Sequence, residues 1–481
     1  MSVASPTTRR LTLASPAGRW VLSAAVLGSA MAFLDTTMVN VALPAVGKAL
    51  GGGFSLLQWV IVAYLVTLAS LVLLGGALGD ILGSDRVFLA GLAAFGLTSL
   101  LCGVAPTGLA LVAFRLLQGA AAGLLIPGAL AIVATSFAGE ERGRAIGIWS
   151  GLSGLATVVG PLLGGALVDA ASWRGVFLIN VPLAVVALVI ALRHVPANDT
   201  GMRSLREHLD LAGAACCAAG LLLLVYALVQ GPQGGSGPAV VAALVLAAAA
   251  FVAFFGIEGR RDRPMLPLPL FAIRDFAVAN LTTLLVYAAL SVSLFLIVLQ
   301  LQRISGYSAL GSGVAIFPIT LLLFVLPPRM SGLVSRMGPR RLMTLGPLVA
   351  AIGLLLFTRL STGNSYTKVV LPAAVVFGLG LAITVAPLTT TMLRSVPAAR
   401  AAVASGVNNA IARLAGFLGV ALVPLFTGLA RSGAAGATLT QGFHRTMLIS
   451  AALCVAGAAA SFVGLRRRRR KDPAIAAATA V

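Results

Sequence analysis

Residues 32–44 read AFLDTTMVNVALP and lie inside an apolar run from about Trp20 to Val46. That run is long enough to cross a bilayer, because a membrane-spanning helix takes roughly 20 residues. Asp35 lies near the middle of the run, where a carboxylate costs ~2.5–3.5 kcal/mol on insertion scales. Every other acidic residue falls in a predicted loop or at a predicted helix end. A single acid deep in the membrane therefore indicates a functional group.

The composition predicts a polytopic membrane protein. Hydrophobic residues make up 59% of the 481 residues and charged residues only 10%, whereas soluble domains carry about 25% charge. The net charge of +21 would suggest a nucleic-acid partner in a soluble protein. Here the basic residues lie in short loops, which favours orientation in the bilayer by the positive-inside rule and no nucleic-acid partner.

Hydropathy predicts an all-α integral membrane fold with fourteen transmembrane helices. If the N-terminus lies inside, most of the 34 Lys and Arg residues fall in inside segments. We therefore expect a multi-pass protein of the plasma membrane with both termini cytoplasmic. The predicted helices span about 20–46, 56–79, 87–105, 109–137, 145–168, 175–193, 210–230, 238–257, 277–301, 311–328, 341–360, 368–393, 401–430 and 442–465.

A weak internal repeat predicts two halves. The loops at residues 76–86 and 331–341 match at Leu78/Leu333, Gly83/Gly338 and Arg86/Arg341 with one shared offset. Two six-helix bundles with an inserted helix pair would give this pattern, and such parallel repeats occur in transporters. The predicted parts are a disordered cytoplasmic N-terminus (1–18), an N-terminal bundle (19–193), inserted helices 7 and 8 with their loops (194–276), a C-terminal bundle (277–465) and a basic tail (466–481).

The basic tail has two interpretations. It could bind anionic lipid headgroups, at ~1 kcal/mol per basic residue. The simpler interpretation, which we favour, is a topology anchor for the last helix.

The string from Leu34 to Pro44 resembles the first-helix signature of the fourteen-span drug:proton antiporters of the major facilitator superfamily. The resemblance continues through nearly the whole chain. The loop after the second helix is similar to the superfamily's loop motif and departs from it at three positions where basic residues are usual, namely Ile81, Ser84 and Asp85. The motif residues to which the resemblance assigns a conformational role are Gly76, Asp80, Gly83 and Arg86.

The fourth helix carries a polar stripe, since Arg115, Gln118 and Gly119 recur at helical spacing. A buried arginine cannot lose its charge and needs a partner. At 1.5 Å per residue, Arg115 and Asp35 lie at nearly the same depth. Arg115 could instead brace helix packing through carbonyls and Gln118. The resemblance implies that Asp35 and Arg115 couple transport to protons.

The fifth helix contains Gly160, Pro161, Gly164 and Gly165 in a pattern that resembles a motif of antiporters, largely absent from symporters, with Ala156 in place of one glycine. Small residues let another helix approach closely, and a proline permits a bend. Because small-xxx-small spacing is common in membrane helices, the pattern could also reflect packing alone. Together with the other motifs it favours export.

Candidates for lining a substrate cavity are Asn40, Gln118, Asn409 and Arg413. Asn409 and Arg413 share a helix face at i, i+4; they line a polar cavity, or Arg413 bonds to a neighbour's backbone. The deep ionisable groups, Asp35, Arg115 and Arg413, leave one net positive charge. This predicts neutral, weakly basic or anionic lipophilic substrates and poor transport of dications.

Nothing in the sequence indicates an enzyme. It contains no Walker lysine motif, no paired intramembrane carboxylates and no histidine cluster. We therefore expect no metal and no cofactor beyond the proton-motive force. The predicted function is export of small lipophilic compounds by a monomeric proton-coupled antiporter with alternating access. The alternatives are an uptake symporter of the same fold and a non-transporting membrane scaffold.

Overall fold

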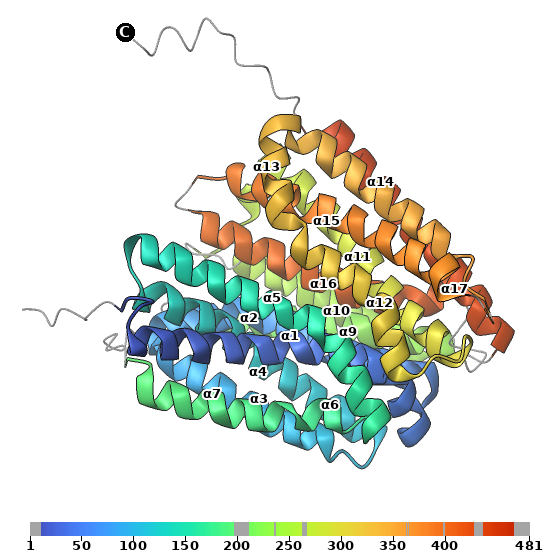
Figure 1. The fold of residues 1–481 in the computed structure, drawn as a ribbon, viewed down its shortest axis with the longest axis horizontal. Helices are drawn as coiled ribbons and strands as arrows, with labels where there is room; N and C mark the ends of the chain where they lie inside the picture. The colour runs from blue at the N-terminus through green and yellow to red at the C-terminus, as the bar shows by residue number, and fades with distance from the viewer. Residues whose placement is uncertain are drawn as a thin grey trace, which may run out of the picture.

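The computed structural model describes residues 11–196, 211–234, 237–261, 267–361, 363, 365–397, 400–427 and 436–465. Apart from one isolated bridge between Leu11 and Phe137, the regular elements in these ranges are helices. They run side by side along the long axis of the molecule (Figure 1). The tail at 466–481 and most of the predicted disordered N-terminus lie outside the described residues.

The elements in chain order are α1 (Pro16–Leu50), α2 (Gly53–Leu82), α3 (Ser84–Gly103), α4 (Gly108–Ser136), α5 (Gly139–Ala170), α6 (Gly175–Leu178), α7 (Asn180–His194), α9 (Leu211–Gly234), α10 (Pro238–Glu258), the 3₁₀ turn η1 (Leu268–Ala272), α11 (Arg274–Arg303), α12 (Ala309–Val325), α13 (Pro327–Met337), α14 (Pro339–Phe357), the π-helical turn η2 (Tyr366–Val370), α15 (Leu371–Arg394), α16 (Ala401–Thr427) and α17 (Gly436–Gly464).

The predicted all-α membrane fold is confirmed. In the described ranges, thirteen helical segments are long and apolar enough to cross a membrane, with α6 and α7 counted as one. The shorter α12 has 17 residues, about 25 Å at 1.5 Å per residue, and lies within the range of membrane-spanning helices. These segments correspond to the fourteen predicted spans. An even number of crossings places the start of α1 and the end of α17 at one face of the bundle.

Two predicted helices are broken, in each case next to a proline. The helix predicted at 311–328 ends at Val325, and α13 starts at Pro327. Proline disfavours the helical conformation of the residue before it but is well suited to the first turn of a new helix. The helix predicted at 175–193 is interrupted at Ile179. Pro182 lacks the amide hydrogen that would bond to Leu178, which weakens the helix at this point.

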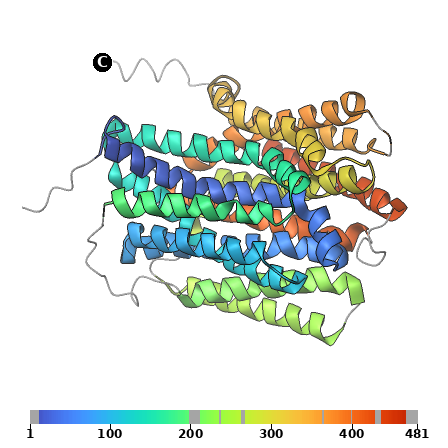
Figure 2. The same ribbon diagram turned by 60° about the horizontal axis from the view of Figure 1, so that its bottom comes forward.

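The inserted pair lies at the edge of the bundle, as the view in Figure 2 shows. Helix α9 packs on α10 and also against α2 and α16. An apolar cavity of about 200 Å³ lies between the pair and these two helices, lined among others by Ser70, Cys217, Phe254 and Leu414. Because α2 precedes the insertion and α16 follows it, the pair covers one edge of the seam between the two halves. The sequence limits of the predicted domains remain predictions.

The internal repeat has a backbone counterpart. Gly83 has φ 97° and directly precedes α3, and Gly338 has φ 80° and directly precedes α14. Residues with a Cβ rarely adopt such positive φ values, which explains glycine at both positions. The two matched loops therefore make the same turn between successive helices in each half.

Candidate functional site

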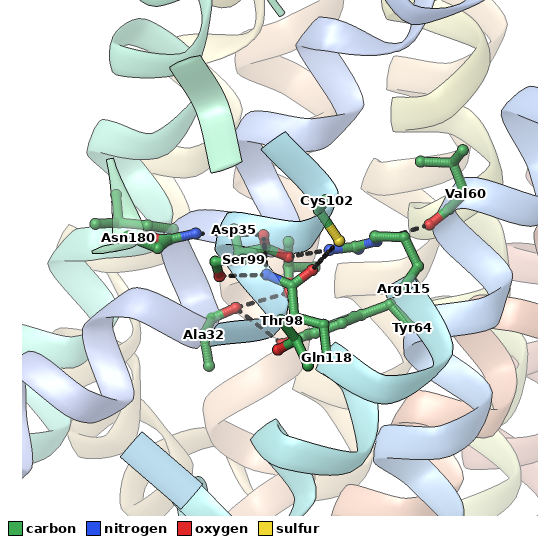
Figure 3. Close-up of polar contacts among 12 residues, drawn as sticks. Ala32, Asp35, Val60, Tyr64, Thr98, Ser99, Cys102, Arg115, Gln118 and Asn180 are labelled. Atoms are coloured by element: carbon green, nitrogen blue, oxygen red, sulfur yellow. Dashed lines mark hydrogen bonds and ion pairs between the residues drawn. The ribbon is translucent and has the colours of Figure 1, made fainter. Parts of the chain in front are cut away.

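Asp35 of α1 and Arg115 of α4 form an ion pair in the centre of the N-terminal half (Figure 3). Nη1 of Arg115 lies 2.5 Å from Oδ2 of Asp35, and the side chains are 1% and 0% exposed. The partnership that their membrane depths predict is thus present. A buried pair of this kind is stable only when the remaining polar atoms are also satisfied.

Two further side chains, Gln118 and Asn180, satisfy this pair. Gln118 donates from Nε2 to Asp35 Oδ1 (3.0 Å) and to Ser99 Oγ (2.8 Å), while its Oε1 accepts from Arg115 Nη1 (2.7 Å). Asn180 also donates from Nδ2 to Asp35 Oδ1, at 3.5 Å. Both carboxylate oxygens therefore accept hydrogen bonds, as an ionised carboxylate does. The arrangement corresponds to unprotonated Asp35.

Arg115 is also held on its other sides. Its Nε donates to the carbonyl of Val60 at 3.0 Å, and its guanidinium carbon lies 4.3 Å from the ring centre of Tyr64 and 5.7 Å from that of Phe177. The sequence left open whether Arg115 pairs with Asp35 or braces helix packing through backbone carbonyls and Gln118. In the structure both kinds of contact are present. Aromatic faces stabilise a desolvated cation. The network is electrically neutral and completed within the N-terminal half.

Several members of this network were not predicted from the sequence, among them Ser99, Asn180 and Tyr64. Ser99 and Asn180 come from α3 and α7, and Tyr64 from α2. Asn180 had a signal, since a buried amide within an apolar helix needs a partner. Ser99 had none, because isolated serines are common in membrane helices.

The candidates for a substrate cavity have different environments. Gln118 belongs to the buried network and has no exposed surface in this conformation. Asn40 and Asn409 donate to carbonyls of their own helices, at 3.2 and 3.1 Å, and Asn409 is exposed. Arg413 reaches from α16 across the seam, with its guanidinium carbon 5.9 Å from the ring centre of Phe33 in α1.

The glycine motif of α5 contacts both halves of the molecule. A Cβ on Gly160 or Gly164 would collide with Thr37 or Met38 of α1. A Cβ on Gly165 would lie 2.5 Å from Cα of Leu310 in α12. Gly313 of α12 packs against the carbonyl of Pro161 in α5, and a Cβ on Gly313 would collide with that carbonyl. The motif therefore allows backbone-to-backbone packing across the seam.

The end of the bundle at which α1 begins and α17 ends is called the terminal face. The other end of the bundle is called the opposite face. The halves are joined near the opposite face by polar bonds. Gln302 of α11 donates to the carbonyl of Val41 at 2.9 Å, and Gln58 of α2 donates to that of Val420 at 2.6 Å. Asp169, at the end of α5, accepts from the first two backbone amides of α12, at 3.1 and 2.8 Å.

Toward the terminal face the same seam opens. A Cβ on Gly154 of α5 would still lie 3.7 Å from Phe324 of α12. Closer to the terminal face, the same side of α5 carries Gly143, Gly147 and Gly151. At these three outer positions a Cβ would meet nothing within 4 Å. Helices α5 and α12 thus touch from the opposite face to about mid-depth and then separate. Along this part of the seam the two halves are therefore in contact near the opposite face and apart toward the terminal face.

The loop motif after α2 lies at the terminal face. Gly76 is in α2, and Gly83 makes the turn into α3, where Arg86 is exposed in the first turns. The backbone of Asp80 belongs to α2, and its side chain lies outside the described part of the structure. The conformational role of these residues stays a prediction.

Replacing Asp169 by alanine should shift the molecule away from the conformation seen here. The carboxylate caps α12 from the other half, and a lost helix cap costs ~0.5–2 kcal/mol, with the lower end applying to an exposed group. Spin labels at Gly143 in α5 and Thr389 in α15 would lie near the terminal face, one in each half. In Asp169→Ala we expect short distances between the two labels to become more populated. Glu140→Ala, at the exposed start of α5, is the matched control. An unchanged distance distribution in Asp169→Ala would contradict this assignment.

Apolar helices in two halves, with a buried charge pair at mid-depth of one half, are the arrangement of a membrane transport protein. A family model described as the Major Facilitator Superfamily matches residues 25–420, and the chain belongs to this family. It is a multi-pass membrane protein.

Two relatives and one solved structure show what the chain resembles. The chain is 33% identical over 404 residues to the multidrug resistance protein Stp of Mycobacterium tuberculosis (strain CDC 1551 / Oshkosh), covering 84% of this chain and 74% of that protein. It is 37% identical over 413 residues to the puromycin resistance protein pur8 of Streptomyces alboniger, covering 84% and 80%. A crystal structure of a POT family transporter in complex with 5-aminolevulinic acid has a TM-score of 0.70 at 14% identity, covering 92% and 94%, which shows the fold alone.

Proposed function

We propose that this transporter exports small lipophilic compounds, such as antibiotics or self-made toxic metabolites, in exchange for protons. The observation that carries the proposal is the buried acid at mid-depth of α1, Asp35, whose carboxylate is paired with Arg115. The names of the two relatives, a multidrug resistance protein and a puromycin resistance protein, support export. In this proposal the protein acts as a monomer in the plasma membrane, with its terminal face in the cytoplasm and no cofactor.

In this mechanism Asp35 carries the proton. When ionised it accepts hydrogen bonds from Arg115, Gln118 and Asn180. A proton on Asp35 removes the attraction to Arg115 and leaves the arginine with only Gln118, the Val60 carbonyl and two aromatic rings. Loss of a strong charge-assisted bond in a low-dielectric site changes the packing of α1 against α4. Because α1 also packs on the glycine motif of α5, this change reaches the seam.

Alternating access follows from the two ends of the seam. The conformation described here, closed at the opposite face and open at the terminal face, would load the compound from the cytoplasm. Separation of α5 from α12 at Gly165, with loss of the Asp169 cap, would open the outside. Rocking of two halves about a central site is the general behaviour of this architecture.

Uptake by proton symport is the second candidate. It shares the fold and Asp35, and the solved structure with the TM-score of 0.70 is a POT family transporter. At 14% identity that likeness supports the architecture only. The glycine motif of α5 and the names of the relatives favour export.

Everted membrane vesicles test the function directly. Vesicles energised by respiration should accumulate radiolabelled puromycin or 1-naphthoate when they contain the protein, since their cytoplasmic face points outward. A protonophore should abolish the accumulation, and vesicles without the protein provide the baseline. Accumulation that survives the protonophore would contradict proton coupling, and no accumulation above baseline would contradict export of these compounds.

A further inference from the structure

Arg413 is a second intramembrane cation, and no acid among the described residues forms an ion pair with it. It lies near the middle of the 27-residue helix α16 and is partly buried. Among the residues that the structure describes, the Arg413 side chain forms no hydrogen bond or ion pair. Its guanidinium carbon lies near the ring of Phe33. Tyr64 and Tyr287 are close enough to interact with it electrostatically. The backbone bond that would explain Arg413 as a packing element is therefore not found in this conformation.

Asp35, the buried acid at mid-depth of α1, is not available to Arg413. Asp35 is engaged by three donors of its own half, and its charge is balanced by Arg115. Asn408, which lies earlier in α16 than Arg413, uses its amide on Asn280 and Thr283, at 3.0 and 2.8 Å. Among the residues that the structure describes, Arg413 is therefore a positive charge at the seam that no acid balances. An arginine at membrane mid-depth costs ~2.5–3.5 kcal/mol on insertion scales, so its presence without a partner calls for a ligand.

The position of Arg413 suits contact with a transported molecule. It extends from the C-terminal half toward α1 of the N-terminal half, so a molecule held there touches both moving parts. A guanidinium offers a planar fork of donors that matches a carboxylate. The ring of Phe33 beside it offers an apolar face to a flat ring system.

We propose that Arg413 is the recognition site for an acidic group, a carboxylate or an ionised phenol, on aromatic lipophilic substrates. The proposal deepens the proposed function by naming its substrate class, and rests on that function for the direction of transport. A monoanion neutralises the seam, and Phe33 stacks on the adjoining ring. A dication would add two charges to a positive site in low dielectric, where repulsion is strong.

Binding to purified protein tests this without any gradient. The probes are 1-naphthoate and 2-anthroate, each paired with its primary amide, which keeps the size and removes the charge. Affinities are obtained from thermal-shift titrations. We expect each acid to bind roughly ten-fold tighter than its amide, the effect of one charged hydrogen-bonded contact. In Arg413→Gln the ratio should fall to about one, and in Arg413→Lys, which keeps the charge, it should remain well above one.

Lys368→Gln is the matched control, because it removes an exposed positive charge at the opposite end of α15 and should leave the ratio unchanged. Arg413→Met provides a second charge-free variant should the glutamine variant fail to fold. An acid-to-amide ratio of one in the wild type, no binding of either acid, or a ratio that survives in Arg413→Gln and Arg413→Met would overturn the proposal. Failure of proton-coupled export would show in the vesicle assay instead, since the titration involves neither protons nor direction.

Discussion

Asp35→Asn is expected to abolish proton-driven accumulation while the protein is still made and inserted. Asparagine keeps the size of the side chain but cannot take up or release a proton. It also leaves Arg115 without its counter-ion in a site that is 0–1% exposed. Removing one partner of a buried ion pair costs ~3–5 kcal/mol, so we also expect a lower melting temperature. The measurement is accumulation in energised everted vesicles, normalised to the amount of inserted protein.

Glu140→Gln is the control for this experiment. It makes the same carboxylate-to-amide change at an exposed position in the first turn of α5 and should transport as the wild type does. Asp35→Asn protein that accumulates substrate at near wild-type rates would rule out Asp35 as the proton carrier.

Gly165→Val is expected to have the second largest effect. In the conformation described here a Cβ at this position would lie 2.5 Å from the backbone of Leu310 and 2.7 Å from the carbonyl of Ala309. Helix backbones cannot retreat as a flexible side chain can, and overpacking costs ~1–3 kcal/mol. Closure at the opposite face, and with it the transport rate, should fall by roughly ten- to hundred-fold, since each 1.4 kcal/mol corresponds to ten-fold.

Gly147→Val separates this steric effect from the general consequences of a branched residue in α5. Gly147 lies on the same helix, and a Cβ there would meet nothing within 4 Å. The two variants should be inserted equally well and differ in transport. Equal activity of both would mean that the contact between α5 and α12 does not limit closure.

The ion pair could be predicted because depth in a membrane is a one-dimensional quantity. Counting residues from the helix ends places Asp35 and Arg115 at the same level, and a buried arginine needs an acid. The break between α12 and α13 also has a signal in the sequence, the two consecutive prolines Pro327 and Pro328. Hydropathy alone nevertheless predicted one span over residues 311–328. Hydropathy measures length and composition and does not register a lost amide hydrogen.

The partners of the pair on other helices could not be predicted in the same way. Whether Ser99 or Asn180 faces Asp35 depends on the rotation of α3 and α7 about their axes, and these helices are apolar on nearly all sides. Contacts across the seam, such as Gln58 with Val420, join segments separated by 362 residues. They depend on which conformation of the two halves is populated, which no local pattern specifies.

The central claim is that substrate and proton move in opposite directions on the same protein. The most direct measurement records proton flux with a pH-sensitive dye trapped inside proteoliposomes, after a gradient of an accumulated compound is imposed without any pH gradient. Protein-free liposomes supply the passive component. We predict proton movement against the direction of the compound, and none in Asp35→Asn. Proton movement in the same direction as the compound, or none in the wild type, would contradict the account.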